Sequence, residues 1–108
     1  ITILGRESEL INVGGEKVAP IEIETAIRQI EEVQDVGVIG VTNRTFGEIP
    51  VAYIVTKSEI KEQEIVNHCN KMLERYKIPQ EIIFTEKIPK NESGKIKRDI
   101  LKDRYKKE

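Results

Sequence analysis

Residues 35–41 (DVGVIGV) and 49–56 (IPVAYIVT) form the most continuous apolar part of the chain. Both segments are rich in valine and isoleucine, which favour β-strands. The intervening residues 43–47 (NRTFG) make a connection too long for a tight two-residue turn. We therefore expect an antiparallel strand pair joined by a loop, with Pro50 near the start of its strand or at a sheet edge.

Three helices are predicted around this pair, over residues 20–31, 59–75 and 96–107. Each carries apolar residues at helical spacing on one face. These are Ile23, Ala26, Ile27 and Ile30 in the first, Ile65, Cys69, Met72 and Leu73 in the second, and Ile96, Ile100, Leu101 and Tyr105 in the third. The first helix begins at Pro20, with Glu22 and Glu24 near the positive end of its dipole. Pro79 is expected to end the second.

The remaining segments complete a small α+β domain. Residues 81–85 predict a third strand, and residues 1–4 and 9–13 predict two short extended pieces before a turn at Gly14 and Gly15. The predicted fold is a small α+β sandwich: a central three-stranded sheet flanked by helices, plus a short N-terminal hairpin. At 108 residues we expect one domain.

Composition narrows the class of protein. Charged residues make up 34% and hydrophobic residues 38%, which is typical of a globular domain, and no apolar run approaches the length of a membrane span. The chain starts at Ile1 and its single methionine is Met72, so we expect a piece of a longer polypeptide. One cysteine, Cys69, permits no internal disulfide and fits a reducing cytoplasm. We expect Cys69 in the core and the lone His68 at the surface.

Charge is distributed unevenly along the chain. From Lys87 onward there are nine Lys or Arg against four acids, a balance of +5, so the preceding part carries −6 of the total of −1. A basic end of this kind either contacts phosphates or forms a solvated helix face.

One polar loop, residues 89–98 (PKNESGKIKR), holds a Gly-Lys pair between the predicted third strand and third helix. Asn91, Ser93 and Gly94 favour turns, so this loop can project the ammonium group of Lys95. Taken alone, an exposed lysine in a glycine turn is ordinary. No phosphate-binding P-loop, dinucleotide fingerprint or metal-ligand spacing occurs, and no metal site is expected in the chain.

Three separated stretches together resemble a known family. Residues 5–24 (GRESELINVGGEKVAPIEIE) resemble the signature that opens the C-terminal domain of acyl-adenylate-forming enzymes. Residues 76–79 (YKIP) look like the Lys-x-Pro of that family, and residues 89–98 are similar to its closing Pro-x-x-x-x-Gly-Lys-Ile-x-Arg motif. The superfamily includes acyl-CoA synthetases, the adenylation domains of peptide synthetases and luciferase.

The resemblance implies a two-step ligase. A carboxylate attacks the α-phosphate of ATP to give an acyl-adenylate and pyrophosphate, and a thiol, usually coenzyme A, then displaces AMP. In the family a large N-terminal domain binds ATP, Mg²⁺ and the acyl substrate, while the small C-terminal domain rotates between the half-reactions. Residues 1–108 look like the small domain, inactive alone, with residues 1–8 including the hinge and the N-terminal domain of the same polypeptide as partner.

The resemblance also assigns residue roles. Lys95 matches the catalytic lysine that contacts the carboxylate and α-phosphate during adenylation, where a compact cation lowers the repulsion between two anions. Arg6 matches an arginine near the ribose of the nucleotide. Ser8 matches the hinge position, where the family more often has Asp or Lys.

A second set of roles concerns coenzyme A. Gly14, Gly15, Glu16 and Lys17 match the loop that lines the pantetheine tunnel during thioester formation. Phe46 lies where relatives often place an aromatic residue facing the coenzyme; from the sequence alone it is either a lid over local core or a stacking surface for a ligand.

Two alternatives accompany this interpretation. Within the family, the chain could belong to a peptide-synthetase adenylation domain, although the Gly-Gly-Glu-Lys-Val-x-Pro wording favours CoA ligases. From another class, it could be a noncatalytic module whose basic helix binds a polyanion. With aromatics at 5% and no tryptophan, stacking on bases is poorly supported, and no nucleic acid partner is expected. The resemblance places the acyl-substrate pocket in the N-terminal domain, so this sequence does not identify the carboxylic acid.

Overall fold

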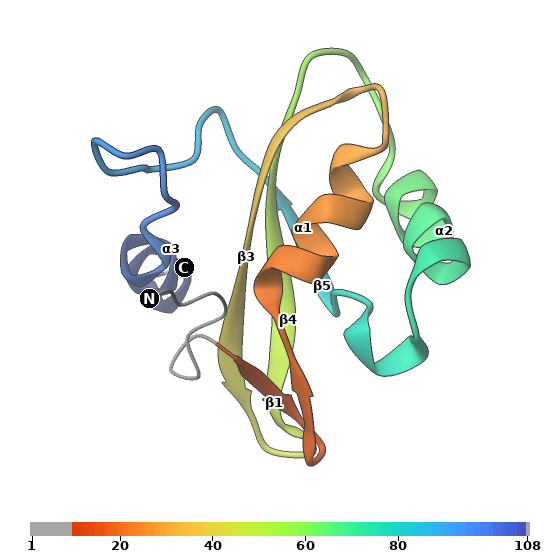
Figure 1. Cartoon of the computed structure of the whole chain (residues 1–108), viewed down its shortest axis with the longest axis vertical. Coiled ribbons are helices and arrows are strands. Elements are labelled where there is room, and N and C mark those ends of the chain that lie inside the picture. The colour runs from red at the N-terminus through yellow and green to blue at the C-terminus, as the bar shows by residue number, and fades with distance from the viewer. Residues whose placement is uncertain (1–9, 108) are drawn as a thin grey trace.

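The computed structural model describes residues 10–107, in which strands and helices alternate around one sheet (Figure 1). The elements in chain order are β1 (Ile11–Val13), β2 (Glu16–Val18), α1 (Pro20–Arg28), β3 (Val33–Asn43), β4 (Gly47–Thr56), α2 (Glu62–Met72), the 3₁₀ turn η2 (Arg75–Lys77), β5 (Glu81–Phe84) and α3 (Arg98–Lys107). No helix of this described part is long and apolar enough to cross a membrane.

The predicted strand pair is the centre of the sheet. β3 and β4 are antiparallel, with a register that runs from Val33↔Thr56 to Asn43↔Gly47. β5 pairs with β4 in parallel, which the intervening α2 allows because a parallel pair needs a crossover connection. The hairpin β1–β2 joins the other end of β4 through Val13↔Gly47. The α+β class is therefore confirmed, and the hairpin extends the central three strands into one five-stranded sheet.

The N-terminal hairpin differs in detail from the prediction. Its two strands, β1 and β2, turn at Gly14 and Gly15, so the second strand lies after the glycines, at residues 16–18. The extended piece expected at residues 1–4 lies outside the described residues. The turn predicted at Gly14 and Gly15 is confirmed, and it closes the hairpin between Val13 and Glu16.

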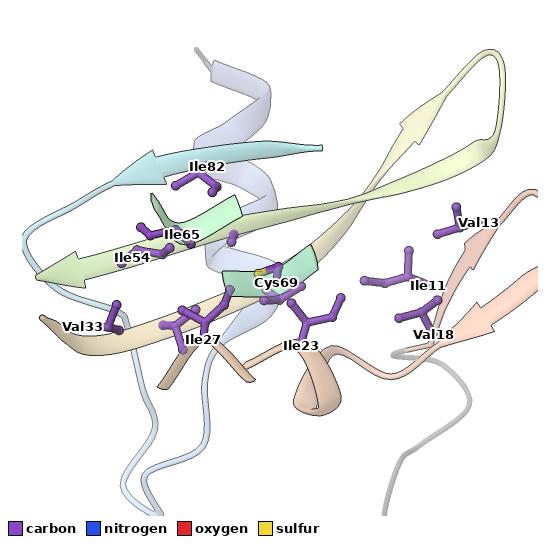
Figure 2. Packing of buried hydrophobic residues seen from close by; sticks show 13 residues of the cluster. Ile11, Val13, Val18, Ile23, Ile27, Val33, Ile54, Ile65, Cys69 and Ile82 are labelled. Carbon is purple, nitrogen blue, oxygen red and sulfur yellow. The ribbon is translucent and has the colours of Figure 1, made fainter. Parts of the chain in front are cut away.

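The helices bury one hydrophobic cluster on each face of the sheet. α1 and α2 cover one face, where Ile23, Ile27, Ile65 and Cys69 gather with strand residues (Figure 2). α3 covers the other face through Leu101, which is fully buried. A Cβ added at Gly37 would lie 3.0 Å from a methyl carbon of Leu101, so a glycine in β3 permits this close approach of α3.

Two predicted core positions are wrong. Met72 is 49% exposed because α2 ends at this residue and the chain is extended at Leu73, before it reaches Pro79. Ile100 is 38% exposed because α3 packs through Leu101, and neighbours on a helix point about 100° apart. Cys69 is buried as predicted. His68 is half-buried rather than at the surface, with its Nε2 2.9 Å from the carbonyl oxygen of Ala26, and this contact links α2 to α1.

Candidate functional site

The Gly-Lys loop is a closed turn. Lys90 and Ile96 form an antiparallel bridge at its base, and the N–H of Asn91 donates to the carbonyl of Lys95 at 2.9 Å. The N–H of Gly94 donates to the carbonyl of Asn91, also at 2.9 Å. Gly94 has a φ of 86°, a backbone conformation that residues with a Cβ rarely adopt. We call residues 90–96 the lysine turn.

Two cations near the lysine turn pair with carboxylates of the fold, whereas Lys95 is exposed to solvent. Lys90 Nζ lies 2.6 Å from Asp35 Oδ2, and Arg98 lies 2.7 Å from Glu24 Oε2, so both tie the loop to the rest of the fold. Lys95 is exposed, and its ammonium has no hydrogen bond or ion pair with any described residue. The structure thus holds the turn at both ends and presents Lys95 to the outside.

Glu24 and Arg98 form a buried ion pair at the edge of the sheet, which we call the clasp. Glu24, on α1, is 2% exposed and accepts the N–H of Val38 at 2.9 Å and a guanidinium N–H of Arg98 at 2.7 Å. Arg98, at the start of α3, also donates its Nε–H to the carbonyl of Val38 at 3.0 Å. Because β3 is an edge strand between α1 and α3, this pair joins the two helical layers and satisfies both backbone groups of Val38.

Burial and the contacts of Glu24 have opposite effects on the pKa of its carboxyl. Burial raises the pKa of its carboxyl, while the positive charge of Arg98 and the N–H of Val38 lower it; burial dominates. A buried carboxylate without its arginine would lose the interaction that offsets its desolvation. Glu24 had been expected only to complement the helix dipole, and its principal contact is instead with Arg98.

A second, more exposed contact anchors the other end of the lysine turn on the same strand. Asp35 accepts the N–H of Val36 at 2.8 Å and pairs with both Lys90 and Arg28. Burial acts to raise the pKa of Asp35, but the hydrogen bonds from Lys90 and Val36 and the charge of Lys90 outweigh it, so the pKa is lowered.

The glycine turn of the hairpin lies against the loop between β3 and β4. Gly14 and Gly15 have φ of 58° and 95°, and the N–H of Gly14 donates to the carbonyl of Phe46 at 2.7 Å. Phe46 is 42% exposed, and one ring carbon would lie 3.8 Å from a Cβ added at Gly14. We call these two adjoining loops, residues 12–17 and 43–48, the glycine tip.

Side chains that accept backbone N–H groups hold the glycine tip together. Asn12 accepts the N–H of Gly15 at 3.1 Å, and its own N–H donates to Glu48 at 2.8 Å. Asn43 accepts the N–H of Phe46 at 3.0 Å. The tip therefore exposes backbone, an aromatic ring and the exposed residues Glu16 and Lys17. Among the described residues no group of three or more His, Cys, Asp or Glu could hold a metal ion.

Comparison with known proteins identifies the family. Residues 22–95 match the model of the AMP-binding enzyme C-terminal domain. This chain belongs to that family. The match ends at Lys95, and it includes the whole sheet except the hairpin β1–β2.

Similar proteins of this AMP-binding C-terminal family include CoA ligases. The chain is 42% identical over 104 residues to long-chain fatty acid–CoA ligase FadD13 of Mycobacterium tuberculosis. The matched region covers 95% of this chain and 21% of that protein. It is 45% identical over 103 residues to 2-succinylbenzoate–CoA ligase of Listeria monocytogenes, covering 95% and 22%. The chain therefore spans about a fifth of the length of these relatives.

Solved structures agree with this fold. A fatty acyl CoA synthetase of Mycobacterium tuberculosis has a TM-score of 0.87 and 42% identity, with 93% of this chain and 20% of that one covered. The o-succinylbenzoate CoA synthetase of Bacillus subtilis, in complex with its acyl-adenylate intermediate, has a TM-score of 0.88 and 35% identity, with 93% and 21% covered.

Within this AMP-binding domain, the structure separates the predicted site residues into two groups. Gly14, Gly15, Glu16, Lys17 and Phe46 come together at the glycine tip. Lys95 belongs to the lysine turn, the blue loop at the upper left of Figure 1, whereas the glycine tip lies at the bottom, at the ends of β1, β3 and β4. Arg6 and Ser8 lie outside the described residues.

The Lys-x-Pro stretch has a structural contact as well. Lys77 Nζ lies 2.6 Å from Glu22 on α1 and 3.2 Å from Glu74, and the hydrogen bond to Glu22 raises the pKa of Lys77. The second motif is thereby joined to the helix that ends the first, just as Arg98 joins the third motif to Glu24.

Sequence reasoning missed the residues that hold the two groups in place. Glu24 and Asp35 carry no recognisable spacing relative to Arg98 and Lys90, which follow them by 74 and 55 positions. Asn12 lies three residues before Gly15, and Asn43 lies three residues before Phe46. This spacing could have indicated their role, because Asn side chains often accept nearby backbone N–H groups.

Proposed function

We propose that this chain is the C-terminal domain of an ATP-dependent, AMP-forming acyl-CoA synthetase. In the first half-reaction a carboxylate oxygen attacks the α-phosphorus of ATP and pyrophosphate leaves. In the second, the thiol of coenzyme A attacks the acyl carbon, loses its proton, and AMP leaves. The relatives named as CoA ligases support this activity, which belongs to the longer polypeptide and not to these residues alone.

The observation that carries the proposal is the presentation of Lys95. Its turn is tied to β3 by Lys90 and Arg98, and its own ammonium is left without an acidic partner among the described residues. An anionic carboxylate and an anionic triphosphate must approach each other during adenylation. An ammonium brought beside both would lower that repulsion and stabilise the charge that develops on the α-phosphoryl oxygens.

The glycine tip would serve the second half-reaction. Gly14 and Gly15 expose a narrow backbone surface along which the thin pantetheine arm of coenzyme A could pass, beside Glu16 and Lys17. The ring of Phe46, partly exposed beside Gly14, would face the coenzyme. Because the tip and the lysine turn lie apart, a rotation of the domain would bring each in turn to one active centre.

The remaining components belong to the preceding part of the polypeptide. An N-terminal domain would bind ATP, the carboxylic acid and Mg²⁺. Arg6 would approach the ribose, and Ser8 would be the hinge. The proposal includes a cytoplasmic location, where reducing conditions keep the lone thiol of Cys69 free.

The test uses the full-length protein that contains this chain, with ATP and Mg²⁺. Palmitate, as a long-chain fatty acid, and 2-succinylbenzoate are supplied as carboxylates because the relatives are named for these acids. Pyrophosphate, AMP and ADP are measured before and after addition of coenzyme A. We expect pyrophosphate and AMP that depend on one carboxylate, and an acyl-CoA detected by mass spectrometry. Formation of ADP, or no carboxylate-dependent pyrophosphate, would contradict the proposal; reactions without carboxylate are the control.

A further inference from the structure

Asn91 is the residue around which the lysine turn is built. Its backbone makes two of the hydrogen bonds of the turn, with Lys95 and Gly94. Its side-chain Oδ1 makes two more, accepting the N–H of Ser93 at 2.8 Å and the N–H of Lys95 at 3.0 Å. The exposed side chain of Asn91 thus accepts two backbone N–H groups, those of Ser93 and Lys95, in place of backbone carbonyls.

We propose that Asn91 is a positioning residue for Lys95 in the adenylation step; this inference rests on the proposed function. The ammonium of a lysine sits on a flexible four-carbon chain, so its reach is set by where the backbone is held. The contact from Asn91 is to the N–H of Lys95 itself, and not to a neighbouring element. Loss of Oδ1 frees two N–H groups and widens the set of backbone positions from which Lys95 can reach the reacting phosphate.

Two ion pairs anchor the lysine turn at its base, whereas Asn91 contacts the backbone of its tip. Lys90 fixes the base of the turn through Asp35, and Arg98 fixes it through Glu24 and the carbonyl of Val38. Gly94 adds conformational freedom at the tip, because its φ of 86° is adopted readily by glycine. Asn91 therefore controls the tip of the turn, whereas Lys90 and Arg98 control its attachment.

The first measurement is kinetic, on the full-length protein with the carboxylate that gives the fastest pyrophosphate release. We expect Asn91→Ala to lower kcat of adenylation about tenfold or more, since a displacement of about 1 Å can cost a hundredfold. KM for ATP and thioester formation from supplied acyl-adenylate should stay within about twofold. Asn91→Asp, which keeps an acceptor oxygen, should recover most of the rate. The control is Asn67→Ala, which removes an exposed amide from α2 whose side-chain contact is with Gln63.

The second measurement does not depend on activity. Amide hydrogen exchange of residues 90–97 should be faster in Asn91→Ala than in the wild type and should be restored in Asn91→Asp. Unchanged exchange, or equal loss of both half-reactions, would overturn the positioning role. If the wild type itself gives no carboxylate-dependent pyrophosphate while exchange responds as expected, the proposed function fails and the structural part of this inference stands.

Discussion

The lysine turn and the glycine tip are two loops of one sheet that are built on different principles. The lysine turn presents a charge, and it is attached by the ion pair of Lys90 with Asp35 on β3 and by that of Arg98 with Glu24 on α1. The glycine tip presents backbone and an aromatic ring, and it is held mainly by backbone N–H groups donated to Asn12, Asn43 and the carbonyl of Phe46. The cations that anchor the lysine turn, Lys90 and Arg98, are thus different from Lys95, whose ammonium has no ion pair with a described residue.

The comparison predicts that the two loops can be damaged separately, and Lys95→Ala gives the largest effect. In the full-length protein we expect adenylation to fall on the order of a thousandfold, as for loss of one transition-state charge partner. Thioester formation from supplied acyl-adenylate should be largely spared because the glycine tip is intact. Both half-reactions are measured separately, by pyrophosphate release and by acyl-CoA formation.

The control for this variant is Lys97→Ala, which removes an exposed lysine two positions away on the same loop. It should leave both half-reactions near the wild-type rate. Equal loss of both steps in Lys95→Ala would remove the distinction between the two loops.

Arg98→Ala tests the anchoring by charge. It leaves the buried carboxylate of Glu24 without its arginine, and we expect a loss of about 3 kcal/mol in the free energy of unfolding. Lys90→Ala breaks the more exposed pair with Asp35 and should cost about 1 kcal/mol or less. Urea unfolding of the two variants provides the comparison. Similar losses in both would show that the buried clasp contributes no more than the exposed pair.

Alanine substitutions at one glycine of each loop, Gly94 and Gly15, allow the two loops to be compared directly. Gly94 and Gly15 have nearly the same φ, 86° and 95°, and an added Cβ would meet nothing within 4 Å at either position. Alanine at each should therefore cost a similar backbone strain of about 1 kcal/mol. We expect Gly94→Ala to slow adenylation and Gly15→Ala to slow thioester formation, each by about tenfold and each sparing the other step. If both variants slowed the same half-reaction, the assignment of one loop to each step would be wrong.

The smallest predicted effect is a dependence on pH. The pKa of Asp35 is lowered below its ordinary value of 3.8 in the folded chain. Its contacts therefore stabilise the fold fully above pH 3.8, and this contribution is lost as the pH falls through the lower folded-state pKa. We expect Asp35→Asn to lower the free energy of unfolding by about 1 kcal/mol or less at pH 7, with the difference shrinking toward pH 3.

Urea unfolding at several pH values measures this difference, and Glu31→Gln, at an exposed position after α1, serves as the control. The contribution of Glu24 to the free energy of unfolding should depend on pH in the opposite direction to that of Asp35. Burial raises its pKa, so its contribution is fully present below pH 4.5 and declines as the pH rises through the folded-state value. A deficit in Asp35→Asn that is independent of pH would mean that the charge of Asp35 does not anchor the turn.

Much of the fold was predictable because its signals are local. The valine-rich pair became β3 and β4, the spacing of Ile23 and Ile27 gave the buried face of α1, and the Asn, Ser and Gly of residues 91–94 gave a turn. The parallel direction of β5 could also have been inferred, since α2 intervenes between it and β4. Helix ends were less accurate, as Met72 illustrates, because a helix can end before the proline that forbids its continuation.

The sequence by itself determined which residues carry the candidate chemistry: a lysine after a glycine, and a pair of glycines after a strand. Only the tertiary structure decided how they are held. Glu24 and Arg98 are 74 residues apart, and neither periodicity nor composition connects them. They meet because α1 and α3 pack on opposite faces of the sheet and the edge of β3 lies between them. A buried charge is stable only where the fold supplies its partner, and that pairing is a property of the packed chain.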